Sequence, residues 1–146
     1  MSDRLKSNET LKVGEYIQSQ NKKFFCIMQS DGNLCVWNGA PGEGNKFIKW
    51  SSFWSKNYEL ESSQQHIMCM QSDGNLTINC EGNFKWGCYQ ACGTPLFYSP
   101  DYVLWMQNDG NLCIREGDFA GPGDKFIWGS WQDMSKKGYA YELYKD

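Results

Sequence analysis

The stretch Met28-Gln29-Ser30-Asp31-Gly32-Asn33-Leu34 decides the fold, because it occurs three times in the chain. Residues 70–76 repeat it unchanged, and residues 106–112 read Met-Gln-Asn-Asp-Gly-Asn-Leu. A tryptophan closes a short stretch opened by phenylalanine behind each copy. These tryptophans are Trp50, Trp86 and Trp128. Self-similarity at this period predicts a repeat array or an internally symmetric fold.

Each copy has the pattern of antiparallel strands. A short apolar and aromatic run precedes each motif, at 24–28, 66–70 and 102–106. The Asp-Gly pair that follows favours a tight hairpin turn, because glycine accepts a positive φ angle. A Leu-x-Val or Leu-x-Ile stretch then starts the return strand. The sequence therefore predicts an all-β chain with three or four strands per copy and no helix longer than a turn or two.

One copy cannot bury both faces of a small sheet, so three copies are expected to pack around a shared axis, where the three tryptophans meet as core residues. The outer copies carry glycine-rich insertions, at 38–45 and 116–124. With 146 residues, the chain fits one domain. Its expected parts are copies at roughly 8–54, 55–92 and 93–132, followed by a C-terminal strand at 133–146.

Composition and charge exclude several classes of protein. Hydrophobic residues make up 40% of the chain and aromatic residues 16%, which is too many for a disordered segment. The net charge of -3 and the scattered lysines and arginines provide no basic surface, so no nucleic-acid partner is expected. No apolar run of about 18 residues is present, so no membrane insertion is expected. Because no apolar leader follows Met1, we expect a cytoplasmic protein or one secreted without a classical signal peptide.

The sequence provides no pattern of a catalytic or metal site. The single histidine, His66, opens an apolar run, where a structural imidazole is the usual explanation. Cys80, Cys88 and Cys92 lack the paired spacing of a zinc site, and could form one disulfide or remain reduced. Cys35 and Cys113 occupy equivalent positions, which indicates small apolar core residues. We therefore predict no enzyme activity, no cofactor and no metal.

The three motifs resemble the Gln-x-Asp-x-Asn-x-Val-x-Tyr signature of the monocot bulb-type mannose-binding lectins. The stretch Leu11–Ile17 is also similar to the start of the leaderless fish skin-mucus members of that family. The resemblance covers about residues 8–132. It implies a β-prism II fold, with three antiparallel sheets in pseudo-threefold symmetry, and metal-independent binding of mannose or mannose-containing glycans.

Carried over position by position, the resemblance implies three carbohydrate sites. Side chains of Asp, Asn and Gln can together donate to and accept from neighbouring sugar hydroxyls. The sites comprise Gln29, Asp31, Asn33 and Trp37 in the first copy, Gln71, Asp73, Asn75 and Asn79 in the second, and Gln107, Asp109, Asn111 and Arg115 in the third.

The chain departs from the signature at its last position, where the family has a tyrosine that meets the sugar's 4-hydroxyl. Trp37, Asn79 and Arg115 stand there instead, and each can still donate a hydrogen bond. The first copy is expected to bind sugar most strongly, because Trp37 has both an apolar face and an indole donor.

Two further questions stay open at this point. The alternative function is a β-prism scaffold that has lost sugar binding and serves as a protein-interaction module, with Phe53, Trp54 and Trp131 as candidate contact residues. A homodimer is possible, because Tyr139–Tyr144 has the pattern of a strand that could pair within the chain or with a partner. The expected partners are mannose-type glycans or glycoproteins.

Overall fold

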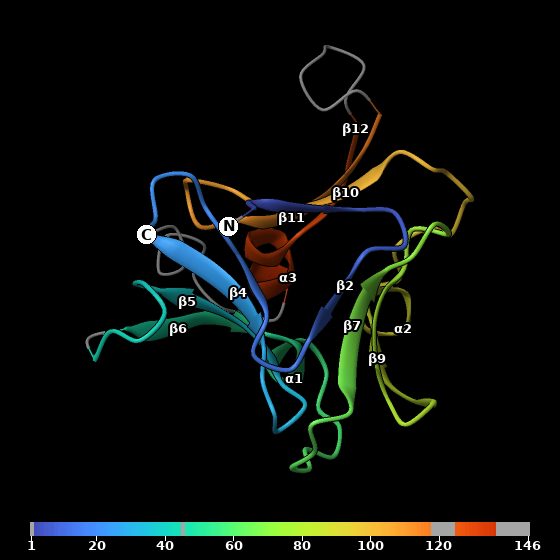
Figure 1. Cartoon of the computed structure of the whole chain (residues 1–146). Coiled ribbons are helices and arrows are strands. Elements are labelled where there is room, and N and C mark those ends of the chain that lie inside the picture. The colour runs from blue at the N-terminus through green and yellow to red at the C-terminus, as the bar shows by residue number, and fades with distance from the viewer. Residues whose placement is uncertain (1, 45, 118–124, 137–146) are drawn as a thin grey trace.

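The computed structural model describes residues 2–44, 46–117 and 125–136. These residues form three antiparallel sheets of four strands each, which stand around a common centre (Figure 1). The strands are β1 (Arg4–Lys6), β2 (Thr10–Lys12), β3 (Tyr16–Gln18), β4 (Phe24–Met28), β5 (Leu34–Asn38), β6 (Phe47–Ser51), β7 (His66–Met70), β8 (Leu76–Cys80), β9 (Asn83–Gly87), β10 (Tyr102–Met106), β11 (Leu112–Glu116) and β12 (Lys125–Gly129). The expectation of an all-β chain with three sheets is confirmed.

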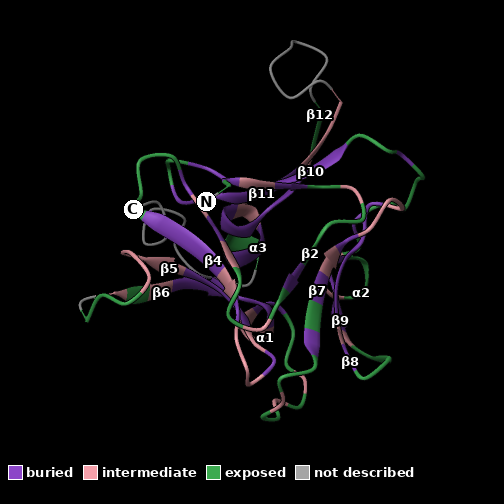
Figure 2. Cartoon of the chain, viewed as in Figure 1, coloured by how far each residue is buried: buried purple, intermediate pink, exposed green. Residues whose placement is uncertain are grey.

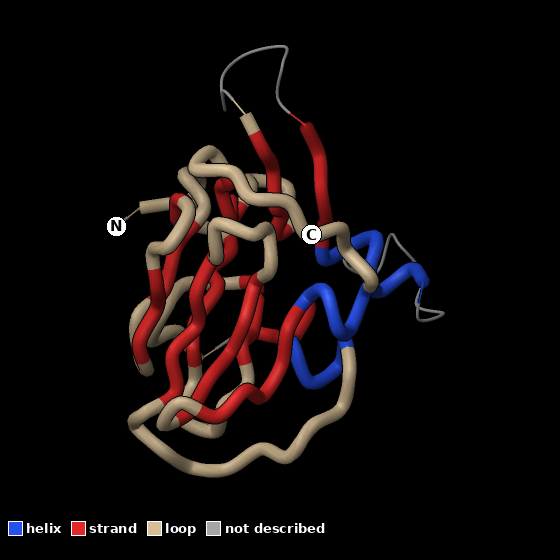
Figure 3. Tube along the Cα trace, turned by 90° about the vertical axis from the view of Figure 1, so that its right-hand side faces the viewer, coloured by secondary structure: helices blue, strands red, loops and turns tan. Residues whose placement is uncertain are grey.

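One short helix follows the last strand of each sheet, and Figure 3 shows the three helices gathered on one side of the strands. They are α1 (Ser52–Ser55), α2 (Cys88–Cys92) and α3 (Ser130–Lys136). Within the described residues no helix is long and apolar enough to cross a membrane.

The N-terminal segment supplies one strand to every sheet. β1 pairs with β10, β2 with β7 and β3 with β4, so the sheets run β1-β10-β11-β12, β2-β7-β8-β9 and β3-β4-β5-β6. The expected first copy at 8–54 therefore does not coincide with one sheet, since β2 belongs to the second sheet. Each of these three-residue strands buries its central side chain, Leu5, Leu11 or Ile17. Strands this short and alike do not reveal their partners in sequence.

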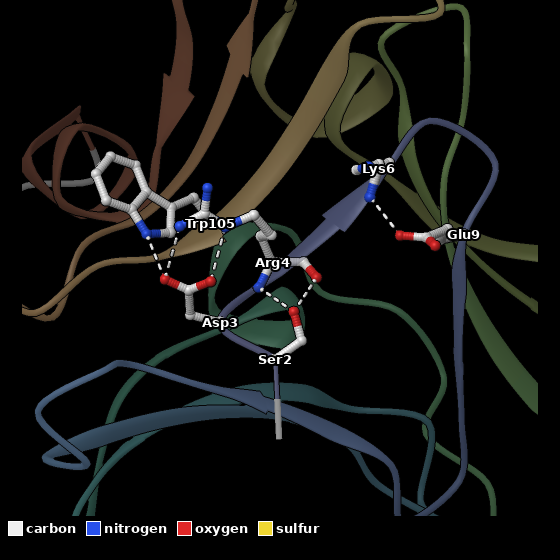
Figure 4. Close-up of polar contacts among 6 residues, drawn as sticks. All are labelled: Ser2, Asp3, Arg4, Lys6, Glu9 and Trp105. Atoms are coloured by element: carbon white, nitrogen blue, oxygen red, sulfur yellow. Dashed lines mark hydrogen bonds and ion pairs between the residues drawn. The ribbon is translucent and has the colours of Figure 1, made fainter. Parts of the chain in front are cut away.

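Polar contacts hold the first strand in place (Figure 4). The Trp105 indole donates to Asp3 Oδ2 at 3.2 Å, and Arg4 Nε donates to Asp3 Oδ1 at 2.7 Å. The Arg4 guanidinium lowers the pKa of the Asp3 carboxyl, and the Trp105 hydrogen bond adds to this effect. Asp3 therefore stays charged and ties β1 to β10 through Trp105.

The core lies where the three sheets face one another, and Figure 2 shows the buried residues concentrated there. Trp50, Trp86 and Trp128 are 1%, 2% and 5% exposed. The Trp50 ring centroid lies 5.9 Å from that of Trp86 and 5.3 Å from that of Trp128, with edge-to-face geometry in both pairs. The prediction that these tryptophans meet near the axis is confirmed.

The three indoles differ in their polar contacts. Trp50 Nε1 donates to Asp133 Oδ2 at 2.9 Å, and Asp133 is only 4% exposed. The buried N–H groups of Trp86 and Trp128 have no partner within the described residues. Of the three tryptophans, only Trp50 therefore links the core to a buried carboxylate by a hydrogen bond, as far as the described residues show.

Five of the seven cysteines are buried. None of the seven, all of which lie in the described residues, forms a disulfide. Cys35 and Cys113 are each 1% exposed, which confirms their interpretation as small apolar core residues. Burial raises the pKa of the Cys35 thiol, so this group stays protonated.

The expected C-terminal strand at 133–146 is wrong at its start, because residues 133–136 belong to α3. Trp131 and Met134 are buried and lie three residues apart, which places both on one face of a helix. The strand-like stretch 139–144 and most of the loop 116–124 lie outside the described residues.

Candidate functional site

Each Gln-x-Asp-x-Asn motif forms the turn between two strands of a sheet, β4–β5, β7–β8 or β10–β11. In the first turn the Gly32 amide donates to the Gln29 carbonyl, and the Gln29 amide donates to the Asn33 carbonyl. The other two turns repeat both bonds. The glycine has a φ angle of 90° or 91° in all three copies, a conformation that disfavours other residues. The backbone of the three turns is therefore the same.

One oxygen of each Asp carboxylate stabilises its own turn. Asp31 Oδ1 accepts from the Asn33 amide at 2.9 Å, and Asp73 and Asp109 make the same bond at the same distance. This is an Asx-type turn. It fixes the carboxylate while its second oxygen keeps acceptor capacity for a ligand.

The Asn side chains connect the turns to the short helices. Asn33 Oδ1 accepts from the Phe53 amide at 3.1 Å. Asn75 Oδ1 accepts from the Tyr89 amide at 2.9 Å, and Asn111 Oδ1 from the Trp131 amide at 3.0 Å. The carbonyl oxygens are thereby engaged, so any further hydrogen bond that an Asn side chain donates comes from its Nδ2 group. Asn75 and Asn111 are only 4% and 5% exposed.

The Gln side chain is held against the Asp carboxylate in the first two copies. Gln29 Nε2 donates to Asp31 Oδ1 at 3.2 Å, and Gln29 Oε1 accepts from the Trp37 indole at 3.1 Å. Gln71 in its better-satisfied orientation donates to Asp73 Oδ1 at 3.1 Å and accepts from the Thr77 hydroxyl at 3.1 Å. Trp37 and Thr77 thus orient their glutamines in equivalent ways.

The last motif position follows a β-bulge in every sheet, between residues 36 and 37, 78 and 79, and 114 and 115. Trp37 uses its indole N–H on Gln29, so the expected indole donor beside the sugar is already engaged. Within the described residues no hydrogen bond joins Asn79 to its glutamine. The Arg115 guanidinium lies 5.8 Å from the Trp105 ring centroid and 5.7 Å from that of Phe126. The structure therefore brings Trp37 to its predicted site most directly.

A residue on each helix, which sequence reasoning did not assign to the sites, distinguishes the copies. Gln90 Oε1 accepts from Asn75 Nδ2 at 3.2 Å, and Gln132 Oε1 accepts from Asn111 Nδ2 at 3.4 Å. Trp54 occupies the equivalent position in the first copy. Like Gln90 and Gln132, it comes directly after the residue whose backbone amide donates to the Asn of the motif. Among the described residues, Asn33 Nδ2 has no acceptor. These three positions lie at the same distance in sequence after Trp50, Trp86 and Trp128, and this equal spacing could have identified them from the sequence.

An open hollow of about 430 Å³ lies beside the first motif. Gln29 and Asp31 line it together with Val13, Gly14 and Gln64. The first copy thus combines a carboxylate, an oriented amide and a concave surface.

No protein-family model matches the chain, and no curated protein matches it. The fold is nevertheless similar to solved lectins. A monomeric monocot mannose-binding lectin from Gastrodia elata is 26% identical, and the match covers 88% of this chain and 96% of the lectin with a TM-score of 0.66. The mannose-specific agglutinin from snowdrop (Galanthus nivalis) bulbs, solved with methyl-α-D-mannoside, is also 26% identical. That match covers 84% of this chain and 96% of the agglutinin with a TM-score of 0.58.

A lectin from Allium sativum is 25% identical over 82% of this chain and 98% of its own, with a TM-score of 0.61. These similarities, together with the three antiparallel sheets, establish the fold as that of the β-prism II lectins.

Proposed function

We propose that the chain is a carbohydrate-binding lectin that recognises mannose or mannose-containing glycans, without a metal ion, through its Gln-x-Asp-x-Asn turns. The observation that carries the proposal is the identical turn geometry of three Asp carboxylates, each fixed at 2.9 Å by the amide of its own Asn. The similarity to mannose-binding lectins of 26% identity adds independent support.

The chemistry of one turn fits a pair of neighbouring sugar hydroxyls. The Asp oxygen that does not accept from the turn amide has acceptor capacity for one hydroxyl. The Asn Nδ2 donates to the other, because the Asn oxygen is already engaged by a backbone amide. Side chains held before the ligand arrives lose little conformational entropy on binding. A sugar whose hydroxyl points away would leave these polar groups unpaired, which is the source of discrimination between hexoses.

The proposal predicts that the purified protein binds mannose-terminated glycans on a glycan array, and that excess EDTA leaves this binding undiminished. The protein itself supplies donors and acceptors at each turn, so no bridging calcium ion is required. Loss of binding in EDTA and its recovery with calcium would contradict the direct role of the Gln, Asp and Asn side chains.

An array without any bound glycan would favour the alternative, a prism that binds protein surfaces. The structure offers little support for its candidate contacts, because Trp131 is 6% exposed and Trp54 packs against the core. The similarity to fish skin-mucus members, the cellular location and a homodimer remain predictions.

Replacing Trp37 with Tyr is expected to strengthen mannose binding at the first site relative to Trp37→Phe. The resemblance implies a tyrosine hydroxyl that meets the sugar's 4-hydroxyl, and Phe provides the same ring without that group. One added hydrogen bond contributes about 0.5–1.5 kcal/mol, or roughly twofold to tenfold in affinity. Titration of both variants with methyl-α-D-mannoside measures the difference, and equal affinities would contradict a 4-hydroxyl contact at this position.

A further inference from the structure

The second sheet differs from the other two at one packing position. The first residues of β4, β7 and β10 are Phe24, His66 and Tyr102, and each ring packs against the turn glycine of another copy. His66 packs on Gly32, whereas the phenyl ring of Phe24 packs on Gly110. His66 is 1% exposed and is the single histidine of the chain. An imidazole therefore occupies the position where the other two copies have a phenylalanine or a tyrosine ring.

Two neighbours of His66 also differ from their counterparts in the other copies. Cys80 is the cross-strand partner of His66, where the sheet β3-β4-β5-β6 has Asn38 opposite Phe24. Glu61 donates its backbone amide to the Asp31 carbonyl at 3.0 Å, as Phe97 does to Asp73 at 2.9 Å, so these two residues are equivalent. The second copy thus has His and Cys where the first copy has Phe24 and Asn38, and Glu61 where the third copy has Phe97.

The three side chains meet at one place. One ring nitrogen of His66, Cys80 Sγ and a Glu61 carboxylate oxygen all lie within 4.8 Å of one another. Donor atoms of a tetrahedral zinc site lie about 3.3–3.7 Å apart, given bond lengths of about 2.0–2.3 Å. The exposed Glu61 side chain can move to close the remaining gap, whereas His66 and Cys80 are held on adjacent strands.

The His66 ring is already oriented by its surroundings. Its Nδ1 lies 3.0 Å from the Ser63 carbonyl, which can only accept, so Nδ1 carries the proton and donates. In the neutral ring this leaves the lone pair on Nε2. A Cβ placed on Gly32 would lie 2.7–3.2 Å from three ring atoms, so the glycine lies against the ring face and not along the in-plane lone pair. A backbone carbonyl that holds the other ring nitrogen is the usual second partner of a metal-binding histidine.

We propose that Glu61, His66 and Cys80 form a zinc-binding site with three protein ligands and a fourth position for water. A nitrogen, a thiolate and a carboxylate form a ligand set that suits Zn²⁺ and not Ca²⁺ or Mg²⁺, which prefer oxygen alone. A Zn–S bond forms as Cys80 loses its proton to solvent, so the two anionic ligands balance the charge of the ion. Lys85 Nζ, 2.6 Å from Glu61 Oε1, is the group that the ion displaces.

The proposed zinc site is next to the first Gln-x-Asp-x-Asn turn, because His66 packs against Gly32. None of its three ligands is a residue of that turn. The Glu61 and Ser63 amides donate to the carbonyls of Asp31 and Ser30, at 3.0 and 2.8 Å. Zinc binding stands apart from the proposed lectin function, since its ligands do not belong to any Gln-x-Asp-x-Asn motif. It can therefore be tested without any sugar.

The test is a titration of the reduced, chelator-treated full chain with Co²⁺, followed by Zn²⁺. We expect one Co²⁺ per chain, with a thiolate-to-cobalt absorption band and the visible bands of a tetrahedral ion, all removed by one equivalent of Zn²⁺. His66→Phe and Cys80→Asn introduce the residues that β4 and β5 have at the equivalent positions, Phe24 and Asn38. Both variants should therefore keep the fold, and both should lose the bands. Glu61→Gln should weaken Co²⁺ binding at least tenfold, and Lys85→Met should strengthen it.

Cys92→Ser is the control, because the Cys92 thiol also lies close to a carboxylate oxygen, 3.5 Å from Asp133 Oδ1, but outside the proposed site. This variant should keep the bands at full intensity. The proposal is overturned if the wild-type chain shows no thiolate band. It is equally overturned if the band survives in folded His66→Phe and Cys80→Asn proteins, or disappears in Cys92→Ser. Folding of each variant is checked by circular dichroism.

Discussion

Replacing Trp50 with Ala is expected to lower the free energy of unfolding by about 3–5 kcal/mol, the usual cost of truncating a large buried aromatic side chain. Trp50 is 1% exposed and contacts the rings of both Trp86 and Trp128, so its loss leaves a cavity at the centre of the prism. Denaturation by urea, followed by tryptophan fluorescence and circular dichroism, measures the change.

A matched pair of phenylalanine variants separates the cavity from the hydrogen bond. Trp50→Phe and Trp86→Phe remove the same atoms from two buried, equivalent positions. Trp50→Phe also deprives the buried Asp133 carboxylate of a donor, whereas the Trp86 N–H has no partner to lose. A buried polar group left unsatisfied costs about 1–3 kcal/mol, so Trp50→Phe should be the more destabilising by about that amount. Equal losses would show that the Asp133 contact contributes nothing to stability.

The sequence predicted the repeat, the strands and the central tryptophans because these features are local or recur at a fixed offset. The distribution of the N-terminal strands over three sheets was not predictable in the same way. Leu5, Leu11 and Ile17 are each a single buried residue in a three-residue strand, and the choice of partner is set by contacts made far along the chain. The start of the C-terminal segment was also missed, since Trp131 and Met134 alone do not distinguish a short helix from a strand.

The candidate sites illustrate the same division. The repeated Gln, Asp and Asn side chains were identified from sequence, whereas their hydrogen-bond partners within the protein were not. The Asn33 oxygen is engaged by the Phe53 amide, and the Trp37 indole is engaged by Gln29. Each contact joins a residue of the turn to a strand or a helix, and the residue types alone do not indicate it. The zinc ligands likewise lie on a loop and two strands that only the fold brings together.

The largest expected effect on function comes from the three carboxylates. Asp31→Asn, Asp73→Asn and Asp109→Asn should each remove one sugar site, because a charged acceptor contributes about 1.5–3 kcal/mol to a hydrogen bond. A shallow site of this kind is expected to have a dissociation constant near a millimolar, about -4 kcal/mol, so such a loss takes it below detection. Asn keeps the side-chain oxygen that accepts from the turn amide, and the variants should therefore remain folded.

The effects should be unequal, with Asp31→Asn the most severe. The first copy has the hollow of about 430 Å³ and a half-buried Trp37 ring. Its Asn33 Nδ2 has no acceptor in the described part of the chain, since Trp54 stands where the other copies have a glutamine. NMR titration with methyl-α-D-mannoside measures each site, with the Trp37 indole resonance as the reporter for the first. Several weak sites that engage one branched glycan together gain avidity, so the triple variant should lose array binding altogether. Undiminished binding by a folded triple variant would remove the site assignment and leave the protein-binding prism as the better account.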